Sequence, residues 1–254
     1  MNNNLPRLDY EEGYKLQLQK NVEEMRKKHD DPEYIDKVKK FIEKFELNEQ
    51  EVFDKYEKDD VFALFFVKDP SRQSFHEKEA AKFIESLNQQ LGVNLFQNFK
   101  KLPKSGKNTL FVANGNVIDY TTRQGRSDGK SIDFYWEYNY KNKKLKFYAS
   151  HKHTGDDGGS QDNQKNDVEA FMEGARSNRS NDEKFYAITD GPYYEDIIDD
   201  LNEMHGNSHV KAIRINDLPY DLAKYIRSWL KEEFGSDAIK EINEFDYIIS
   251  KYDE

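Results

Sequence analysis

The sequence contains no cysteine among its 254 residues, which excludes disulfide bonds and thiolate-ligated metal sites. It also contains no apolar run that approaches the roughly 18 residues of a transmembrane helix, and residues 1–20 include no apolar core of a signal peptide. We therefore expect a cytoplasmic protein with no membrane partner. Internal repeats and a glycine-rich phosphate-binding loop are missing as well.

Hydrophobic residues make up only 36% of the chain and charged residues 35%, which predicts a large and highly charged surface. Aromatic residues reach 14% and include 17 Phe and 16 Tyr. This content favours a packed core over disorder. A chain of this length can bury such a core as one domain, or as one domain with a helical extension.

Charge is distributed unevenly along the chain. The net charge is −10, yet the stretch from Gln97 to Lys152 holds 12 Lys/Arg against 4 Asp/Glu, a local balance of +8 that leaves −18 for the rest. This polarity indicates a basic groove on an acidic body, which would suit binding to nucleic acid phosphates. The alternative is a chance cluster of solvated lysines.

Residues 8–58 show helical spacing of apolar and aromatic side chains among Glu and Lys. Asp30-Asp31-Pro32 predicts a break between two helices, and Asn48 predicts the start of a third. We expect residues 1–60 to form a helical N-terminal region for dimerisation or DNA clamping, or a scaffold alone, and residues 61–254 to form the core. The apolar run Val61–Val67 is compatible with a strand or with a buried helical turn.

The core region alternates short β-like runs with helical segments. Asn114-Gly115 separates two of these runs and is a strong hairpin signal. The predicted strands are 109–113, 116–120, 132–140, 145–150, 185–189 and 210–215, and the predicted helices are 76–91, 160–174, 194–204, 219–234 and 238–251. This order predicts an α/β fold with a central mixed β-sheet flanked by helices.

An acid and a lysine stand on two successive predicted strands. The midpoint of Asp133 and Lys152 falls at 142–143, inside the turn Lys141–Lys144, so an antiparallel hairpin would bring the two side by side. Phosphodiester cleavage requires a metal that polarises the phosphate, together with cationic help for the developing charge. Magnesium needs only one or two carboxylates, because it keeps several waters. The pair therefore predicts a magnesium-dependent nuclease.

The segment resembles the PD-(D/E)xK nuclease superfamily, and most nearly its type II restriction endonucleases. Ile132-Asp133 matches the first half of the family motif, and Ser150-His151-Lys152 matches the acid-x-lysine triplet with serine in the place of the acid. Thr109-Leu-Phe-Val ahead of the aspartate and Lys152-His153-Thr154-Gly155 behind it are similar to the EcoRI-like branch. The likeness covers roughly residues 75–195.

The resemblance implies a restriction-endonuclease-like fold, Mg²⁺-dependent hydrolysis of double-stranded DNA at a specific site, and a homodimer. Serine is a poor magnesium ligand. The resemblance therefore also implies that a glutamate on the helix before the sheet, Glu79 or Glu85, serves as a metal ligand in its place. Glu137 shares a strand face with Asp133 and is a third candidate, whereas a solvated helix face is the alternative for the two glutamates. The expected catalytic residues are Asp133, Lys152, Ser150 and Glu79, and the expected metal ligands are Asp133, Glu79 and Glu85.

DNA contacts are expected around the same strands. His151 and His153 should point away from Lys152, and packing or phosphate contact is favoured over a zinc site because no third ligand is evident. An amide-rich helix start follows and could read adenine edges, or could be an ordinary capped turn. The expected DNA-binding residues are Arg123, Arg126, Lys130, His151, His153, Gln161, Asn163, Gln164 and Asn166.

Three further functions stay open. One is a DNA repair or phage nuclease, or a junction resolvase, of the same superfamily. Another is a catalytically inactive DNA-binding relative, which Ser150 in the place of the acid would explain. The last is an acidic interaction protein whose basic segment is incidental.

Overall fold

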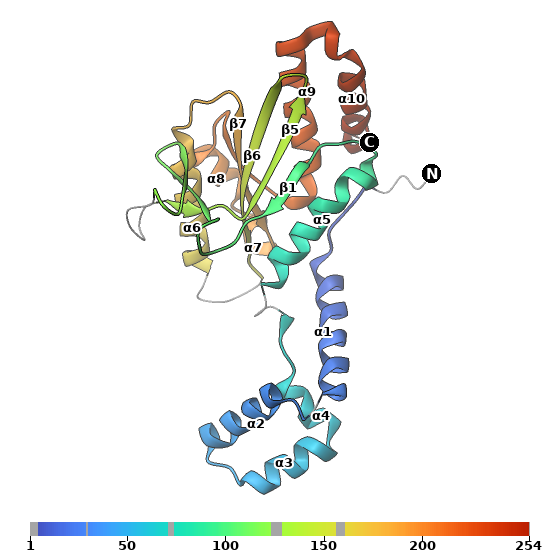
Figure 1. The fold of residues 1–254 in the computed structure, drawn as a ribbon, viewed down its shortest axis with the longest axis vertical. Helices are drawn as coiled ribbons and strands as arrows, with labels where there is room; N and C mark the ends of the chain where they lie inside the picture. The colour runs from blue at the N-terminus through green and yellow to red at the C-terminus, as the bar shows by residue number, and fades with distance from the viewer. Residues whose placement is uncertain (1–4, 29, 71–73, 123–128, 156–160, 254) are drawn as a thin grey trace. The chain divides into compact units, whose positions relative to one another are not determined.

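A computed structural model describes residues 5–28, 30–70, 74–122, 129–155 and 161–253. The chain forms two compact units (Figure 1), a helical unit of Asp9–Glu79 and a sheet unit that comprises the rest of the chain. The expected boundary at residue 60 falls inside the helical unit. None of the helices in the described ranges is both long and apolar enough to cross a membrane.

The helical unit contains α1 (Tyr10–Lys27), α2 (Pro32–Phe45), α3 (Glu49–Lys58), α4 (Asp60–Ala63) and the 3-10 turn η1 (Leu64–Phe66). The predicted helix starts are confirmed: the side chain of Asp31 accepts a hydrogen bond from Glu33 N with Pro32 in the first turn, and Asn48 caps α3. Tyr34, Tyr56 and Phe66 form its small core together with Met25, Val38, Val52 and Ala63.

Residues 61–66 of the apolar run are helical and Val67 is extended, which excludes the strand alternative. Asp59 accepts hydrogen bonds from Val61 N and Phe62 N, both at 3.0 Å, and so starts the turn. The turn is not buried as a whole, because Val61 is 72% and Phe65 78% exposed. Only part of the apolar run therefore contributes to the core.

The sheet unit is built on a five-stranded mixed sheet, which confirms the α/β class. Its strands are β1 (Gln97–Lys101), β5 (Phe134–Tyr140), β6 (Lys143–His153), β7 (Glu183–Asp190) and β8 (Val210–Ile213), in that spatial order. The pairs β1–β5 and β5–β6 are antiparallel, whereas β6–β7 and β7–β8 are parallel. The polar edge strand β1 was not predicted.

A second, three-stranded sheet has the order β3-β2-β4, with β2 at Leu110–Ala113, β3 at Asn116–Asp119 and β4 at Lys130–Ser131. The hairpin at Asn114-Gly115 is confirmed: both residues have positive φ, 49° and 76°, as a type I′ turn requires. The two predicted strands therefore pair with each other, but they do not join the central sheet.

Helices cover both faces of the central sheet (Figure 1). On one face α6 (Gln161–Arg176) and α8 (Ile198–His205) bury residues such as Phe171, Met172 and Leu201 against Tyr148 and Phe185. On the other, α9 (Leu218–Phe234) and α10 (Ile239–Asp253) pack aromatic rings against Tyr138 and Phe147. The remaining elements are α5 (Phe75–Leu91), α7 (Pro192–Glu195), η3 (Ile215–Asp217) and η4 (Gly235–Ala238), so the single helix predicted for 194–204 is divided between α7 and α8.

Two asparagine side chains occupy the outer edge of β8. Asn202 exchanges two hydrogen bonds with the backbone of Ala212, accepting at 2.8 Å and donating at 2.9 Å, as a neighbouring strand would. Asn207 accepts from Val210 N at 2.9 Å. Because these groups are already paired, the edge offers little to an added strand.

Candidate functional site

The β5–β6 hairpin brings Asp133 next to Ser150. Phe134 pairs with Ala149, so Asp133, the residue before β5, stands opposite Ser150. Asp133 Oδ2 accepts hydrogen bonds from Ser150 Oγ at 3.3 Å and from His151 N at 2.8 Å. The turn is tighter than expected, since Tyr140 pairs with Lys143, and the residue opposite Asp133 is therefore Ser150 and not Lys152.

Lys152 remains on the same face of the sheet as Ser150, because side chains alternate along a strand. Its Nζ lies 3.0 Å from Asp167 Oδ2, and Lys130 Nζ lies 2.6 Å from the other oxygen of the same carboxylate. Burial acts to raise the pKa of Asp167, but the hydrogen bonds from Lys130 and Lys152 prevail and lower it. Strands β4 and β6 and helix α6 thus meet at one carboxylate.

His151 is packed behind this face and is only 6% exposed. Its Nε2 lies 3.3 Å from Asp190 Oδ2, and Asp190 Oδ1 accepts a hydrogen bond from Ile215 N at 3.0 Å. This is the packed arrangement among the alternatives expected for His151, and it keeps the ring away from the surface. His153 is half-buried at the end of β6.

The amide-rich start of α6 follows β6 as expected. Asn163 and Asn166 are exposed, whereas Gln164 is half-buried and its Oε1 accepts a hydrogen bond from Thr154 Oγ1 at 2.6 Å. Gln161 is the first residue of the helix and is half-buried. Arg123 and Arg126, expected to contact DNA, lie outside the described residues. The exposed amides of α6 are placed where a ligand could reach them.

The three acids considered as substitutes for Ser150 are placed differently. Glu85 is exposed on α5. Glu79 belongs to the helical unit, where its carboxylate faces Gly13 of α1. Roles for both as metal ligands stay predictions.

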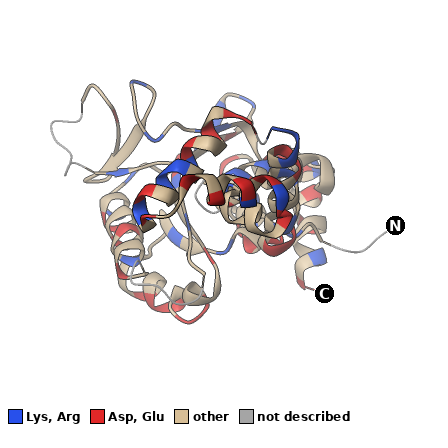
Figure 2. Ribbon diagram, turned by 90° about the horizontal axis from the view of Figure 1, so that it is seen from below, with Lys and Arg blue, Asp and Glu red and all other residues tan. Residues whose placement is uncertain are grey.

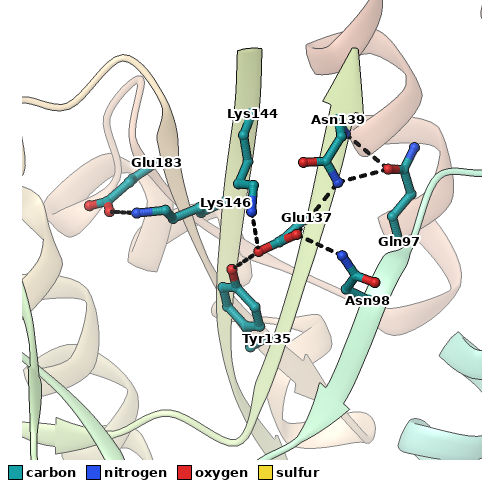
Figure 3. Close-up of polar contacts among 8 residues, drawn as sticks. All are labelled: Gln97, Asn98, Tyr135, Glu137, Asn139, Lys144, Lys146 and Glu183. Atoms are coloured by element: carbon teal, nitrogen blue, oxygen red, sulfur yellow. Dashed lines mark hydrogen bonds and ion pairs between the residues drawn. The ribbon is translucent and has the colours of Figure 1, made fainter. Parts of the chain in front are cut away.

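Glu137 is the centre of a saturated polar cluster (Figure 3). Its carboxylate accepts hydrogen bonds from Tyr135 OH, from Asn98 Nδ2 at 2.8 Å and from Lys144 Nζ at 2.9 Å. Burial alone would raise the pKa of Glu137, yet these hydrogen bonds lower it to about 2. Because these donors occupy its oxygens, Glu137 links β1, β5 and β6 and is not an open metal ligand.

Near Ser150 the structure places the carboxylate of Asp133, whereas both oxygens of Asp167 are bonded to Lys130 and Lys152. The described residues contain no group of three or more His, Asp or Glu that would form a complete metal site. A single carboxylate can nevertheless hold Mg²⁺, which takes its other ligands from water and phosphate oxygens. The donor chemistry here therefore fits magnesium.

Asp167 is the residue that sequence reasoning missed. A signal was present, because Gln164, Asp167, Val168 and Phe171 follow helical spacing, and Val168 and Phe171 are buried. Asp167 therefore lies on the sheet-facing side of α6, where a carboxylate needs a cationic partner.

No protein-family model, no curated protein and no solved structure was found to match the chain.

Proposed function

We propose that this protein is a type II restriction endonuclease, which cuts double-stranded DNA at a short specific site and depends on Mg²⁺. The observation that carries the proposal is the juxtaposition of Asp133 and Ser150 on a hairpin, with Lys152 on the same face and bonded to Asp167. A carboxylate that can hold a metal and a lysine on the same face are groups that serve phosphodiester hydrolysis.

Each side chain has a role that follows from its place. The carboxylate of Asp133 would hold Mg²⁺, which would polarise the phosphate and lower the pKa of an attacking water. Ser150 and the backbone of His151 orient Asp133 through hydrogen bonds to Oδ2. Lys152 supplies positive charge for the phosphate, and Asp167 positions the lysine through an ion pair.

The order of elements supports a restriction-endonuclease-like fold. The helix α5 precedes an antiparallel β1–β5–β6 arrangement, and α6 then leads to β7 in parallel with β6. This is the α/β layering that the resemblance to the superfamily implies, with Asp133 and Lys152 on one face of the sheet.

A homodimer suits the proposed activity, because two sites are needed to cut two strands. The helical unit offers exposed apolar side chains at Val61, Leu64 and Phe65. It holds 20 Asp/Glu against 14 Lys/Arg, a balance of −6, and both signs are interspersed along the helices (Figure 2). This acidity favours a role in dimerisation over one in DNA clamping.

The test is cleavage of phage genomic DNA by the purified protein, with Mg²⁺ or with EDTA, followed by sequencing of the ends. Discrete fragments should need Mg²⁺ and disappear in Asp133→Asn and Lys152→Ala. The control Lys240→Ala alters an exposed lysine on α10 that pairs with Glu244 and should cut normally. Random degradation would contradict site specificity and favour a repair or phage nuclease.

A second candidate is a catalytically inactive DNA-binding relative, favoured by Ser150 in the position of the family acid. Its signature would be DNA binding without cleavage in the wild type and in Ser150→Glu, under Mg²⁺ and Mn²⁺. Cleavage by the wild type would exclude it.

A further inference from the structure

Two ammonium groups share one carboxylate beside Ser150. Lys130 reaches Asp167 Oδ1 at 2.6 Å and Lys152 reaches Oδ2 at 3.0 Å. Within the described part of the chain Asp167 is the only partner of either lysine. The three side chains are 40%, 30% and 42% exposed, so solvent and ligands can reach them. Together they carry a surplus of one positive charge.

The backbone around Lys130 is built to present this side chain. Gly129 has a φ of +81°, and a Cβ atom there would lie 2.6 Å from Val112 O. Only glycine fits such a conformation and such an approach. The pairing of Val112 with Lys130 then fixes β4 next to β2, and its lysine faces α6.

We propose that Lys130 and Lys152 form a clamp for a single backbone phosphate of DNA, and that Asp167 occupies both lysines until DNA arrives. A phosphodiester carries one negative charge and two non-bridging oxygens, which matches the charge surplus and the two ammonium donors. The clamp deepens the proposed function by adding Lys130 to the site, but its phosphate binding does not require cleavage.

The competing explanation is that the ion pairs of Asp167 only stabilise the packing of β4, β6 and α6. The two explanations predict opposite signs for one variant. If Asp167 competes with phosphate, Asp167→Asn frees both lysines and strengthens DNA binding. If Asp167 only holds the fold together, its loss disorders the lysines and weakens binding.

The experiment measures binding of a short mixed-sequence duplex in EDTA, as a function of salt, so that no cleavage occurs. Asp167→Asn should bind about tenfold more tightly or better, because a carboxylate facing the phosphate is removed. The matched control is Asp162→Asn, an exposed acid in the first turn of the same helix, which should gain several-fold less. Equal or weaker binding by Asp167→Asn would overturn the proposal.

Substitution of the two lysines provides a second, independent test of the proposal. Two lysines that neutralise one phosphate should reduce the log–log salt slope by about one in Lys130→Gln/Lys152→Gln, whereas lysines on separate phosphates would reduce it by about two. A slope change of about two would therefore contradict a shared phosphate. If these results hold but the wild type does not cut with Mg²⁺, the clamp stands and the proposed nuclease activity falls.

Discussion

The charge on Glu137 should make a measurable part of the stability of the sheet depend on pH. This side chain is 8% exposed and its carboxylate is bound by three strong donors, from Tyr135, Asn98 and Lys144. Its pKa falls from 4.5 to about 2, because these hydrogen bonds outweigh the effect of burial. A difference of this size corresponds to about 3 kcal/mol of folding free energy.

The sign follows from the direction of the shift. A carboxyl group with a lowered pKa in the folded state contributes its full stabilisation above the unfolded value of 4.5, and loses it as the pH falls toward 2. Glu137→Gln cannot titrate. Between about pH 6 and pH 3.5 the wild type should therefore lose roughly 1 to 2 kcal/mol more than the variant.

Urea denaturation at several pH values measures this difference directly. At neutral pH, Glu137→Gln should be less stable by about 2 to 3 kcal/mol, because three donors lose a charged acceptor. Its deficit should shrink at low pH, while Glu232→Gln, an exposed change on α9, should follow the wild type throughout. Parallel pH profiles for the wild type and Glu137→Gln would refute the reasoning.

Three further predictions concern stability and assembly. Gly191→Ala should destabilise the protein by about 2 kcal/mol or more, because φ is +96° and a Cβ would lie 2.1 Å from Thr154 O; a melting temperature equal to that of the wild type would contradict this close approach. Asn202→Ala should lower the free energy of unfolding by about 1 to 2 kcal/mol and expose the edge of β8. Light scattering should then detect self-association of the variant, and a purely monodisperse variant would argue against edge protection. Phe65→Ser should shift sedimentation toward the monomer with little change in melting temperature, since the ring is 78% exposed; an unchanged sedimentation profile would rule out this ring as a dimer contact.

Local signals predicted much of the fold because each has a local physical cause. Asn114-Gly115, Asp31-Pro32 and Asn48 specify turns and caps through their own backbone preferences, and the structure confirms them. The hairpin of β5 and β6 was also predicted, but its turn has two residues, which moved the partner of Asp133 from Lys152 to Ser150.

Features that depend on distant partners were not predictable in the same way. The strand β1 has the sequence QNFKK, and its polar side chains give no apolar alternation, because it lies at the sheet edge. Strand β4 has two residues, Lys130 and Ser131, and forms through its pairing with β2. Asp167 was overlooked because a charge within a helix usually faces solvent, and only the tertiary fold brings it to the two lysines.

The two-residue turn at Lys141-Asn142 has a consequence for the order of folding. A tight hairpin closes a small loop and forms early, so Asp133 and Ser150 should meet before most of the sheet exists. Lys152 obtains its carboxylate only after α6 has docked, and β7 can pair with β6 only after the same crossover. We expect pulse-labelled hydrogen exchange to protect β5 and β6 ahead of β7, and simultaneous protection would contradict this order. A nascent chain that ends before α6 would then contain Asp133, Ser150 and Lys152, but Lys152 would lack the carboxylate of Asp167.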